Sequence, residues 1–283
     1  MYDVIIIGAG PAGISAGLYS KRAGLNVLIF YTGESNIEKA THINNYYGFI
    51  DEINGKELYK NGIEQAKKLE IELKNEEVID IKKIEDKFIV TTAIGEYSSK
   101  TLIIATGNKK LKPNIKGIKE FEGKGISYCA ICDGFFFRNK NVAVIGSGKF
   151  ALSEAEHLKN IANKVTILTD GKEIKNTGEY EINTKQIKET HGDIKVRQVE
   201  FEDGTKIEID GIFIAIGEAG GTDFAKKMGV VLEEDSIVVD KNMQTNIKGL
   251  YACGNVTGGL LQICKAVYEG AIAGLSAKKY IKS

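Results

Sequence analysis

The chain has 283 residues, a length that two domains accommodate comfortably. Hydrophobic residues make up 43% of it and charged residues 27%, which is typical of a globular protein with a full core. Lysine plus arginine and aspartate plus glutamate both number 38, so the net charge is zero and no overall field attracts nucleic acid or a membrane surface.

The sequence predicts neither a signal peptide nor a membrane span. Asp3 stands where a signal peptide carries basic residues, and Gly8 and Pro11 interrupt the first apolar run. No stretch of about 18 uninterrupted apolar residues follows. We therefore expect a cytoplasmic protein, in which a close cysteine pair is more often catalytic or metal-binding than structural.

The first predicted elements form a β-α-β unit. Residues 2–7 are a continuous apolar run, typical of a buried parallel strand. Residues 8–13 form a glycine loop, and an alanine- and leucine-rich helix extends from it to about Arg22. Residues 26–31 predict a second strand, which completes the unit.

Short alternating segments between residues 70 and 99 predict an antiparallel meander. Residues 102–105 predict another buried strand. The pattern then returns, with a strand predicted at residues 141–145, a glycine loop at 146–151, a helix at 152–160 and a strand at 164–168. A further buried strand is predicted at 212–216. We therefore predict an α/β fold with two Rossmann-like (three-layer ββα) dinucleotide-binding domains.

The last predicted elements are a strand at residues 250–253 and a helix at about 262–280. One strand and one helix cannot form a core alone, so we expect them to return to the first domain. The first domain is then discontinuous in sequence.

The first glycine loop has the spacing of a dinucleotide-binding motif. Gly8 permits the tight turn, Gly10 allows the backbone to approach a pyrophosphate, and Gly13 allows the helix to pack on the strand. Free N–H groups at the start of the helix attract phosphate. The motif follows a strand and opens a helix, which favours a bound dinucleotide over a glycine turn without a ligand.

Cys129 and Cys132 form a C-x-x-C pair, followed by Asp133. This spacing permits a readily reduced disulfide, and the aspartate can pass a proton to the departing thiolate. The alternative is half of a zinc site, which needs two further paired ligands. Cys253 and Cys264 are separated by ten intervening residues in an expected strand and helix, and the three histidines are scattered, so the sequence favours a redox pair.

Taken together, these motifs resemble the low-molecular-weight thioredoxin reductases. The resemblance rests on the two glycine loops, on Ala105-Thr106-Gly107, on Cys-Ala-Ile-Cys-Asp-Gly-Phe-Phe at 129–136 and on Ala-Cys-Gly-Asn at 252–255. It covers nearly the whole chain in order. It implies a homodimer that reduces thioredoxin or a thioredoxin-like protein.

The resemblance also implies an FAD-binding domain made of residues 1–112 and 243–283, and a central NAD(P)H-like domain of residues 113–242 that carries the cysteine pair. The central domain would rotate at the two crossings, near Pro113 and Met243, and present the dithiol alternately to the flavin and to thioredoxin.

By the same resemblance, Cys132 is the sulfur that faces the flavin, Cys129 is the thiol that attacks the partner, and Asp133 is the acid. Asn255 replaces the usual aspartate of the family, and Leu261 replaces an arginine. The residues that the resemblance places along FAD are Gly8, Gly10, Pro11, Ala12, Gly13, Asn45, Ala105, Thr106, Gly107, Gly254, Asn255 and Gln262.

The central domain departs from the NADPH-dependent members. These recognise the 2′-phosphate with an arginine-rich segment after the second strand, because the guanidinium fork matches a phosphate. Here that segment is Thr-Asp-Gly-Lys at 169–172, and Asp170 would repel a 2′-phosphate. No arginine lies between Arg138 and Arg197.

The second glycine loop departs as well. Gly146, Gly148 and Ala151 are retained, but Lys149 and Phe150 replace a small polar pair. We expect the Phe150 ring to occupy space that a nicotinamide nucleotide needs. The sequence therefore indicates a degenerate nucleotide site.

Three interpretations follow for the electron donor and the activity. In the favoured one, the central domain only carries the dithiol and the flavin is reduced by ferredoxin, as in a subfamily of thioredoxin reductases from anaerobes that this chain resembles. In the second, Asp170 binds the ribose diol of NADH, since it lies about 20 residues past the glycine loop. The third is atypical NADPH use, or a flavin-binding sensor or interaction module without turnover.

Overall fold

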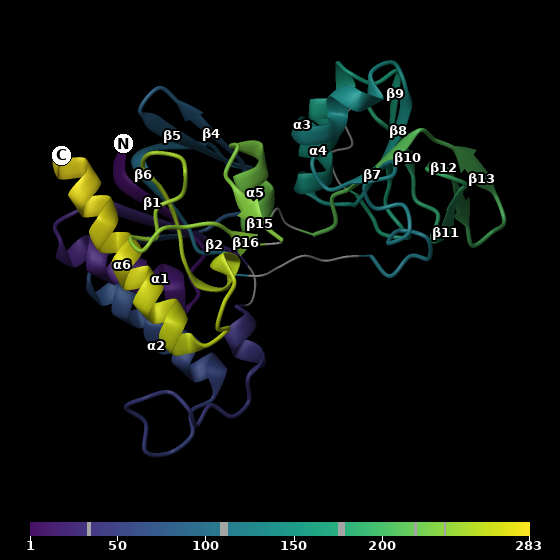
Figure 1. The fold of residues 1–283 in the computed structure, drawn as a ribbon. Helices are drawn as coiled ribbons and strands as arrows, with labels where there is room; N and C mark the ends of the chain where they lie inside the picture. The colour runs from purple at the N-terminus through teal and green to yellow at the C-terminus, as the bar shows by residue number, and fades with distance from the viewer. Residues whose placement is uncertain (33–34, 108–112, 175–178, 218–219, 235) are drawn as a thin grey trace. The chain divides into compact units, whose positions relative to one another are not determined.

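The computed structural model describes residues 1–283 except 33–34, 108–112, 175–178, 218–219 and 235, and the side chains of Ile131 and Cys132 also lie outside the described set (Figure 1). The chain divides into two compact units. Unit 1 comprises residues 1–109 and 220–283, and unit 2 comprises residues 110–219. Within the described part, none of the helices combines the length and the apolar content that crossing a bilayer requires.

Unit 1 is built on a mixed sheet with the strand order β3-β2-β1-β6-β5-β4, in which β17 pairs with β6. The predicted buried strands are present, and the first of them matches its predicted bounds. The strands are β1 (Tyr2–Ile7), β2 (Val27–Tyr31), β3 (Glu72–Asn75), β4 (Val78–Ile84), β5 (Lys87–Thr92), β6 (Glu96–Ile104) and β17 (Leu250–Ala252).

Strand β6 joins two parts of this sheet. Its first half pairs antiparallel with β5 in the predicted meander, and its last three residues pair parallel with β17. The strand predicted at 102–105 is therefore only the second half of a longer strand. The reason is that exposed, half-buried and buried positions are mixed along residues 96–101 of this strand, whereas residues 102–104 are continuously buried.

The helices of unit 1 cover the parallel part of the sheet. Helices α1 and α6 lie side by side (Figure 1). Glycines permit this close approach, since a methyl group at Gly270 would lie 2.1 Å from the Ala12 carbonyl oxygen. The remaining elements of the unit, in chain order, are α1 (Pro11–Arg22), η1 (Asn36–Lys39), α2 (Gly55–Lys68), α5 (Gly221–Lys227), β15 (Leu232–Glu233), β16 (Ser236–Ile237), η3 (Gly254–Thr257) and α6 (Ile263–Lys282).

The second crossing between the units lies near Gly220, not near Met243 as the sequence indicated. Helix α5 is fixed within unit 1, because the Gly221 N–H donates to Thr106 Oγ1 at 3.0 Å. At its other end, Lys227 Nζ lies 3.9 Å from Asp80 Oδ1 in a nearly buried ion pair. The glycine cluster Gly217, Gly220 and Gly221 was the available signal for this crossing in the sequence.

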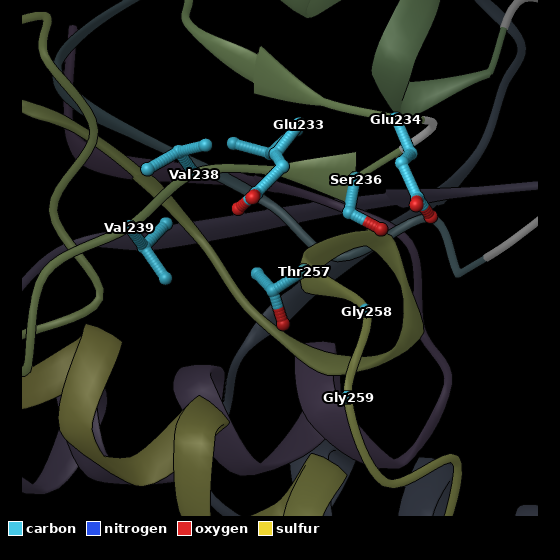
Figure 2. Close-up of a pocket in the computed structure, with 9 residues that line it drawn as sticks. Glu233, Glu234, Ser236, Val238, Val239, Thr257, Gly258 and Gly259 are labelled. Carbon is cyan, nitrogen blue, oxygen red and sulfur yellow. The ribbon is translucent and has the colours of Figure 1, made fainter.

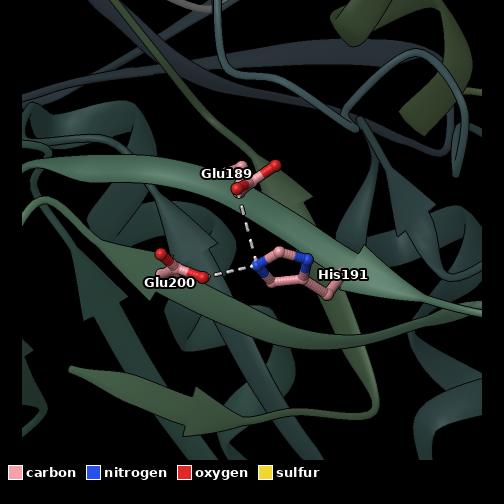
Figure 3. A group of neighbouring side chains, drawn as sticks. All are labelled: Glu189, His191 and Glu200. Atoms are coloured by element: carbon pink, nitrogen blue, oxygen red, sulfur yellow. Dashed lines mark hydrogen bonds and ion pairs between the residues drawn. The ribbon is translucent and has the colours of Figure 1, made fainter. Parts of the chain in front are cut away.

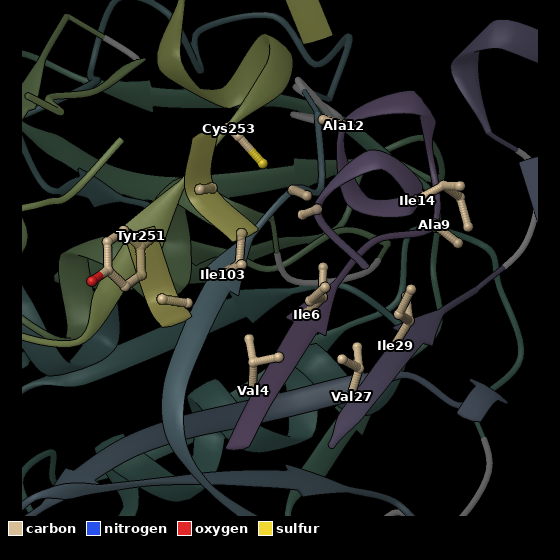
Figure 4. Packing of buried hydrophobic residues seen from close by; sticks show 14 of the residues in the cluster. Val4, Ile6, Ala9, Ala12, Ile14, Val27, Ile29, Ile103, Tyr251 and Cys253 are labelled. Carbon is tan, nitrogen blue, oxygen red and sulfur yellow. The ribbon is translucent and has the colours of Figure 1, made fainter. Parts of the chain in front are cut away.

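The core of unit 1 lies between the sheet and the helix pair α1 and α6 (Figure 4). Branched residues of β1, β2 and β6 face alanines of the two helices, and Cys253 is fully buried among them. Burying this much branched apolar surface is the main stabilising contribution to the unit.

Unit 2 holds a second parallel sheet with the order β10-β9-β8-β14-β7, and a separate antiparallel sheet with the order β11-β12-β13. The predicted α/β class with two Rossmann-like parallel sheets is confirmed. The elements are β7 (Ile126–Ser127), α3 (Ala130–Asp133), η2 (Gly134–Phe137), β8 (Asn141–Ile145), α4 (Lys149–Lys159), β9 (Lys164–Leu168), β10 (Glu181–Asn183), β11 (Ile187–Gly192), β12 (Val196–Phe201), β13 (Lys206–Glu208) and β14 (Gly211–Ile214).

Candidate functional site

The first glycine loop brings strand and helix into direct backbone contact. A methyl group at Gly13 would lie 1.8 Å from the Gly8 carbonyl oxygen, and one at Gly8 would lie 2.4 Å from that of Ala105. Gly8 also has a φ of +108°, which disfavours other residues. The glycine spacing is therefore a packing requirement of this fold as well as a binding motif.

The start of α1 is suited to an anion. The N-cap residue Gly10 has no side chain to cap the helix, and Pro11 at its first position has no N–H to satisfy. Among the described residues, a methyl group at Gly10 would come within 4 Å of Ser35 Oγ alone, at 3.5 Å, an ordinary contact. These features fit a pyrophosphate at the positive end of the helix dipole.

Residues far apart in the sequence meet beside this loop. Gly254 has a φ of +81°, and a methyl group there would lie 2.8 Å from the Ala12 side chain. Asn45 Nδ2 donates to Gln262 Oε1 at 3.1 Å. Ala105 follows β6 and Cys253 follows β17, so these residues gather at the carboxyl ends of parallel strands, where ligands of α/β sheets bind.

Two residues that the sequence interpretation missed hold this region together. Glu269 Oε2 accepts the Gly254 N–H at 2.8 Å, and Lys265 Nζ donates to the Gly254 carbonyl at 2.9 Å. Lys265 and Glu269 pair with each other at 3.1 Å, one turn apart on α6. The i,i+4 spacing of opposite charges was the available signal, but it is also common on solvated helix faces.

A pocket of about 410 Å³ lies between the β15–β16 hairpin and η3 (Figure 2). Glu233 and Glu234 contribute carboxylates to its lining and Thr257 contributes a hydroxyl, and none of the described residues that line it is a lysine or an arginine. Two carboxylates repel phosphate groups. This pocket is therefore unsuited to serve as a replacement nucleotide site.

In unit 2, Cys129 immediately precedes α3. It is disulfide-bonded, and its side chain is only 3% exposed. Ser127 Oγ accepts the Cys129 N–H at 3.1 Å and donates to Asp133 Oδ2 at 2.6 Å. The structure thus brings the predicted acid and Cys129 together on one serine hydroxyl, whereas the predicted role of Cys132 falls on a side chain outside the described set.

Glu154 of α4 is a further residue that the sequence interpretation missed. Its side chain is 1% exposed, and Oε2 accepts the Ala130 N–H at 2.7 Å. Ala130 directly follows Cys129. No spacing rule links position 154 to position 130, so only the fold reveals this contact.

The second glycine loop keeps its packing geometry, since a methyl group at Gly146 would lie 2.1 Å from the Ala215 carbonyl oxygen. Gly148 caps α4 without a side chain, and Lys149 and Ala151 lie in its first turn. Phe150 is 3% exposed and belongs to the unit 2 core cluster with Phe137 and Phe213. The ring therefore packs in the core of unit 2, and its effect on nucleotide binding stays a prediction.

The Asp170 carboxylate binds a backbone N–H group at the start of β11. The residue has a φ of +53°, and its Oδ1 accepts the Ile187 N–H at 2.8 Å. A ribose diol is best bound by a carboxylate with both oxygens available. The engaged carboxylate weakens the NADH interpretation, while its negative charge still opposes a 2′-phosphate.

Glu189, His191 and Glu200 form a cluster on β11 and β12 (Figure 3). Their ligand atoms lie within 4.8 Å of one another, as in a metal site. Three lysines, however, already neutralise the two carboxylates: Lys116 pairs with Glu189, and Lys188 and Lys206 pair with Glu200. Hydrogen bonds from Lys188, Lys206 and His191 lower the pKa of Glu200 to about 2. We interpret the cluster as a charge network that joins the strands.

The two remaining cysteines differ in accessibility, and this predicts their reactivity. Cys253 is buried and Cys264 is exposed, and burial raises the pKa of the Cys253 thiol far above its usual range. Since the thiolate is the reactive form, we expect iodoacetamide to label Cys264 in the native protein and Cys253 only after unfolding. Peptide mass spectrometry checks this; native labelling of Cys253 would contradict the described core.

Comparison with known proteins identifies the family. The model of the pyridine nucleotide-disulphide oxidoreductases matches residues 2–270. The chain belongs to this family. Among curated relatives, a thioredoxin reductase of Listeria innocua is 36% identical over 100% of this chain and 94% of its own. One of Ureaplasma parvum is 38% identical over 99% and 97%.

Among solved structures, the atypical thioredoxin reductase of Desulfovibrio vulgaris Hildenborough matches with a TM-score of 0.91 and 38% identity, over 100% of this chain and 98% of that one. A ferredoxin-flavin thioredoxin reductase of Clostridium acetobutylicum matches with a TM-score of 0.72 and 33% identity, over 99% and 98%. A thioredoxin reductase of Lactococcus lactis matches with a TM-score of 0.60 and 32% identity, over 100% and 99%.

The predicted cofactor, FAD, is confirmed by membership in this family of flavoproteins. The residues fit the group. The uncapped start of α1 suits the pyrophosphate, and the Gly254 turn lies against the same helix. When bound, FAD accepts electrons singly or in pairs and passes a pair to a disulfide.

Proposed function

We propose that this protein is an FAD-dependent thioredoxin reductase that receives its electrons from reduced ferredoxin. The Cys129 site carries the proposal, because a disulfide-bonded cysteine stands beside a hydrogen-bonded carboxylate in the unit that follows the flavin motif. The thioredoxin reductases among its relatives support the substrate class. We further propose that it acts as a homodimer.

With ferredoxin as the donor, the electrons and protons of the disulfide reduction balance. Two reduced ferredoxins supply two electrons, and two protons complete the reduction of the Cys129–Cys132 disulfide to a dithiol. Cys129 then attacks the disulfide of thioredoxin, Cys132 resolves the mixed disulfide, and a reduced thioredoxin leaves. In this proposal Asp133, whose Oδ2 accepts a hydrogen bond from Ser127, supplies a proton to the departing thiolate.

The segment after β9, which would bind the 2′-phosphate of NADPH, has features that support ferredoxin rather than a nucleotide as the electron donor. Asp170 places a negative charge after β9 and is fixed there by the Ile187 N–H. The segment after β9 has no arginine before Arg197 to bind a 2′-phosphate. The similarity to a ferredoxin-flavin thioredoxin reductase supports the same choice.

An anaerobic titration tests the donor. We expect reduced ferredoxin to bleach the flavin absorbance of the purified protein, and NADPH or NADH to leave it unchanged over the same time. The control is a thioredoxin reductase that accepts NADPH under identical conditions. Rapid bleaching by either nucleotide would overturn the ferredoxin proposal and leave a pyridine-nucleotide reductase.

A further inference from the structure

The cysteine motif rests on α4, the helix that follows the second glycine loop. Glu154 accepts the Ala130 N–H at 2.7 Å at the start of the motif. One turn later, Leu158 packs beneath its end, since a methyl group at Gly134 would lie 3.1 Å from Leu158 Cδ2. Positions 154 and 158 share one face of a helix. Helix α4 therefore supports the motif at both ends.

Glu154 is an unusual residue for this place. It is 1% exposed, and the alanines around it, Ala130, Ala151 and Ala155, are fully buried. Burying a carboxyl group is costly unless hydrogen bonds compensate. An apolar residue would fill the same space without that cost, so the carboxylate is expected to serve the motif that it contacts.

We propose that Glu154 is a positioning residue that holds the Cys129–Cys132 pair at a strongly reducing potential. The inference rests on the proposed disulfide-reductase function and deepens it. It also gives the second glycine loop and its helix a role without a bound nucleotide, namely to hold this carboxylate on the backbone next to Cys129.

The physical reason concerns the thiolate of the reduced pair. Backbone N–H groups and positive charges near a cysteine stabilise its thiolate, and a stabilised reduced form makes a dithiol more oxidising. Glu154 does the opposite in two ways. It takes up the N–H of the residue next to Cys129, and it adds a negative charge in a buried region where charges are weakly screened. Both effects keep the pair reducing, as the donor of electrons to another disulfide must be.

Two variants separate this role from simple packing. Glu154→Gln keeps the shape and an oxygen that accepts the Ala130 N–H but removes the charge, whereas Glu154→Leu removes both. Glu156→Gln is the matched control, because Glu156 lies on the same helix and is exposed. All are made as FAD-loaded full chains in a Cys264→Ser background, so that the exposed thiol does not react.

The measurement is the anaerobic equilibrium of each protein with dithiothreitol buffers, with the Cys129–Cys132 peptide scored by alkylation and mass spectrometry. We expect Glu154→Gln to shift the equilibrium about tenfold toward the dithiol, equivalent to about 30 mV, and Glu154→Leu to shift it at least as far. The pH midpoint of Cys129 alkylation should fall in the same variants, and Glu156→Gln should match the parent.

An equilibrium for Glu154→Gln that equals the parent, or one that shifts toward the disulfide, overturns the inference, whether or not Glu154→Leu folds. Failure of the proposed function has a different signature. In that case the parent protein itself would not cycle between disulfide and dithiol, or would cycle without reducing thioredoxin.

Discussion

Cys129→Ser is expected to abolish thioredoxin reduction while the purified protein remains yellow. The residues expected to bind FAD lie in unit 1, and Cys129 lies in unit 2, so the substitution removes the redox pair and leaves every one of those FAD-binding residues in place. Loss of an essential nucleophile lowers turnover by on the order of 10³-fold or more. The flavin-to-protein absorbance ratio and an anaerobic thioredoxin assay with reduced ferredoxin measure the two properties separately.

Cys264→Ser is the matched control, since it makes the same cysteine-to-serine change at an exposed free thiol. It should retain both flavin and activity. Cys132→Ser should behave like Cys129→Ser, because the disulfide requires both sulfurs. Turnover by either single variant above a small fraction of the parent rate would show that the electrons bypass this pair, and the dithiol assignment would fail.

Much of the fold follows from sequence alone where an apolar run ends in glycine. The strands predicted at 2–7, 141–145 and 164–168 match β1, β8 and β9 residue for residue. Buried parallel strands are apolar on both faces, so their bounds are sharp in the sequence. The glycine loops were equally clear, because close backbone approach at Gly8 and Gly13 admits no other residue.

The direction in which a side chain points could not be predicted from the sequence in this way. Spacing placed Phe150 and Asp170 near a nucleotide site, but the structure directs the ring into the core and ties the carboxylate to Ile187. Spacing along the chain locates a residue next to a motif; packing decides whether its side chain faces ligand, core or backbone. Glu154 and Glu269 escaped notice for the same reason, since each acts on a backbone N–H distant in sequence.

Gly13→Ala is expected to yield a protein that has lost FAD and much of its stability. The added methyl group would lie 1.8 Å from the Gly8 carbonyl oxygen and 3.3 Å from the Ala105 side chain. Backbone atoms cannot yield as a flexible side chain does, so α1 must shift away from β1 and distort the loop. Overpacking of this kind costs about 1–3 kcal/mol or more. The flavin-to-protein ratio and the thermal unfolding midpoint report the two losses.

Gly62→Ala supplies the matched control, because it adds the same methyl group within the neighbouring helix α2. There the nearest atom is Ile14 Cγ2 at 3.6 Å, an ordinary contact. Alanine favours a helix interior over glycine by about 0.5–1 kcal/mol, so this variant should keep its flavin and unfold at an equal or slightly higher temperature. A yellow Gly13→Ala protein with the parent midpoint would mean that α1 and β1 tolerate separation, and that the glycine serves neither packing nor the cofactor.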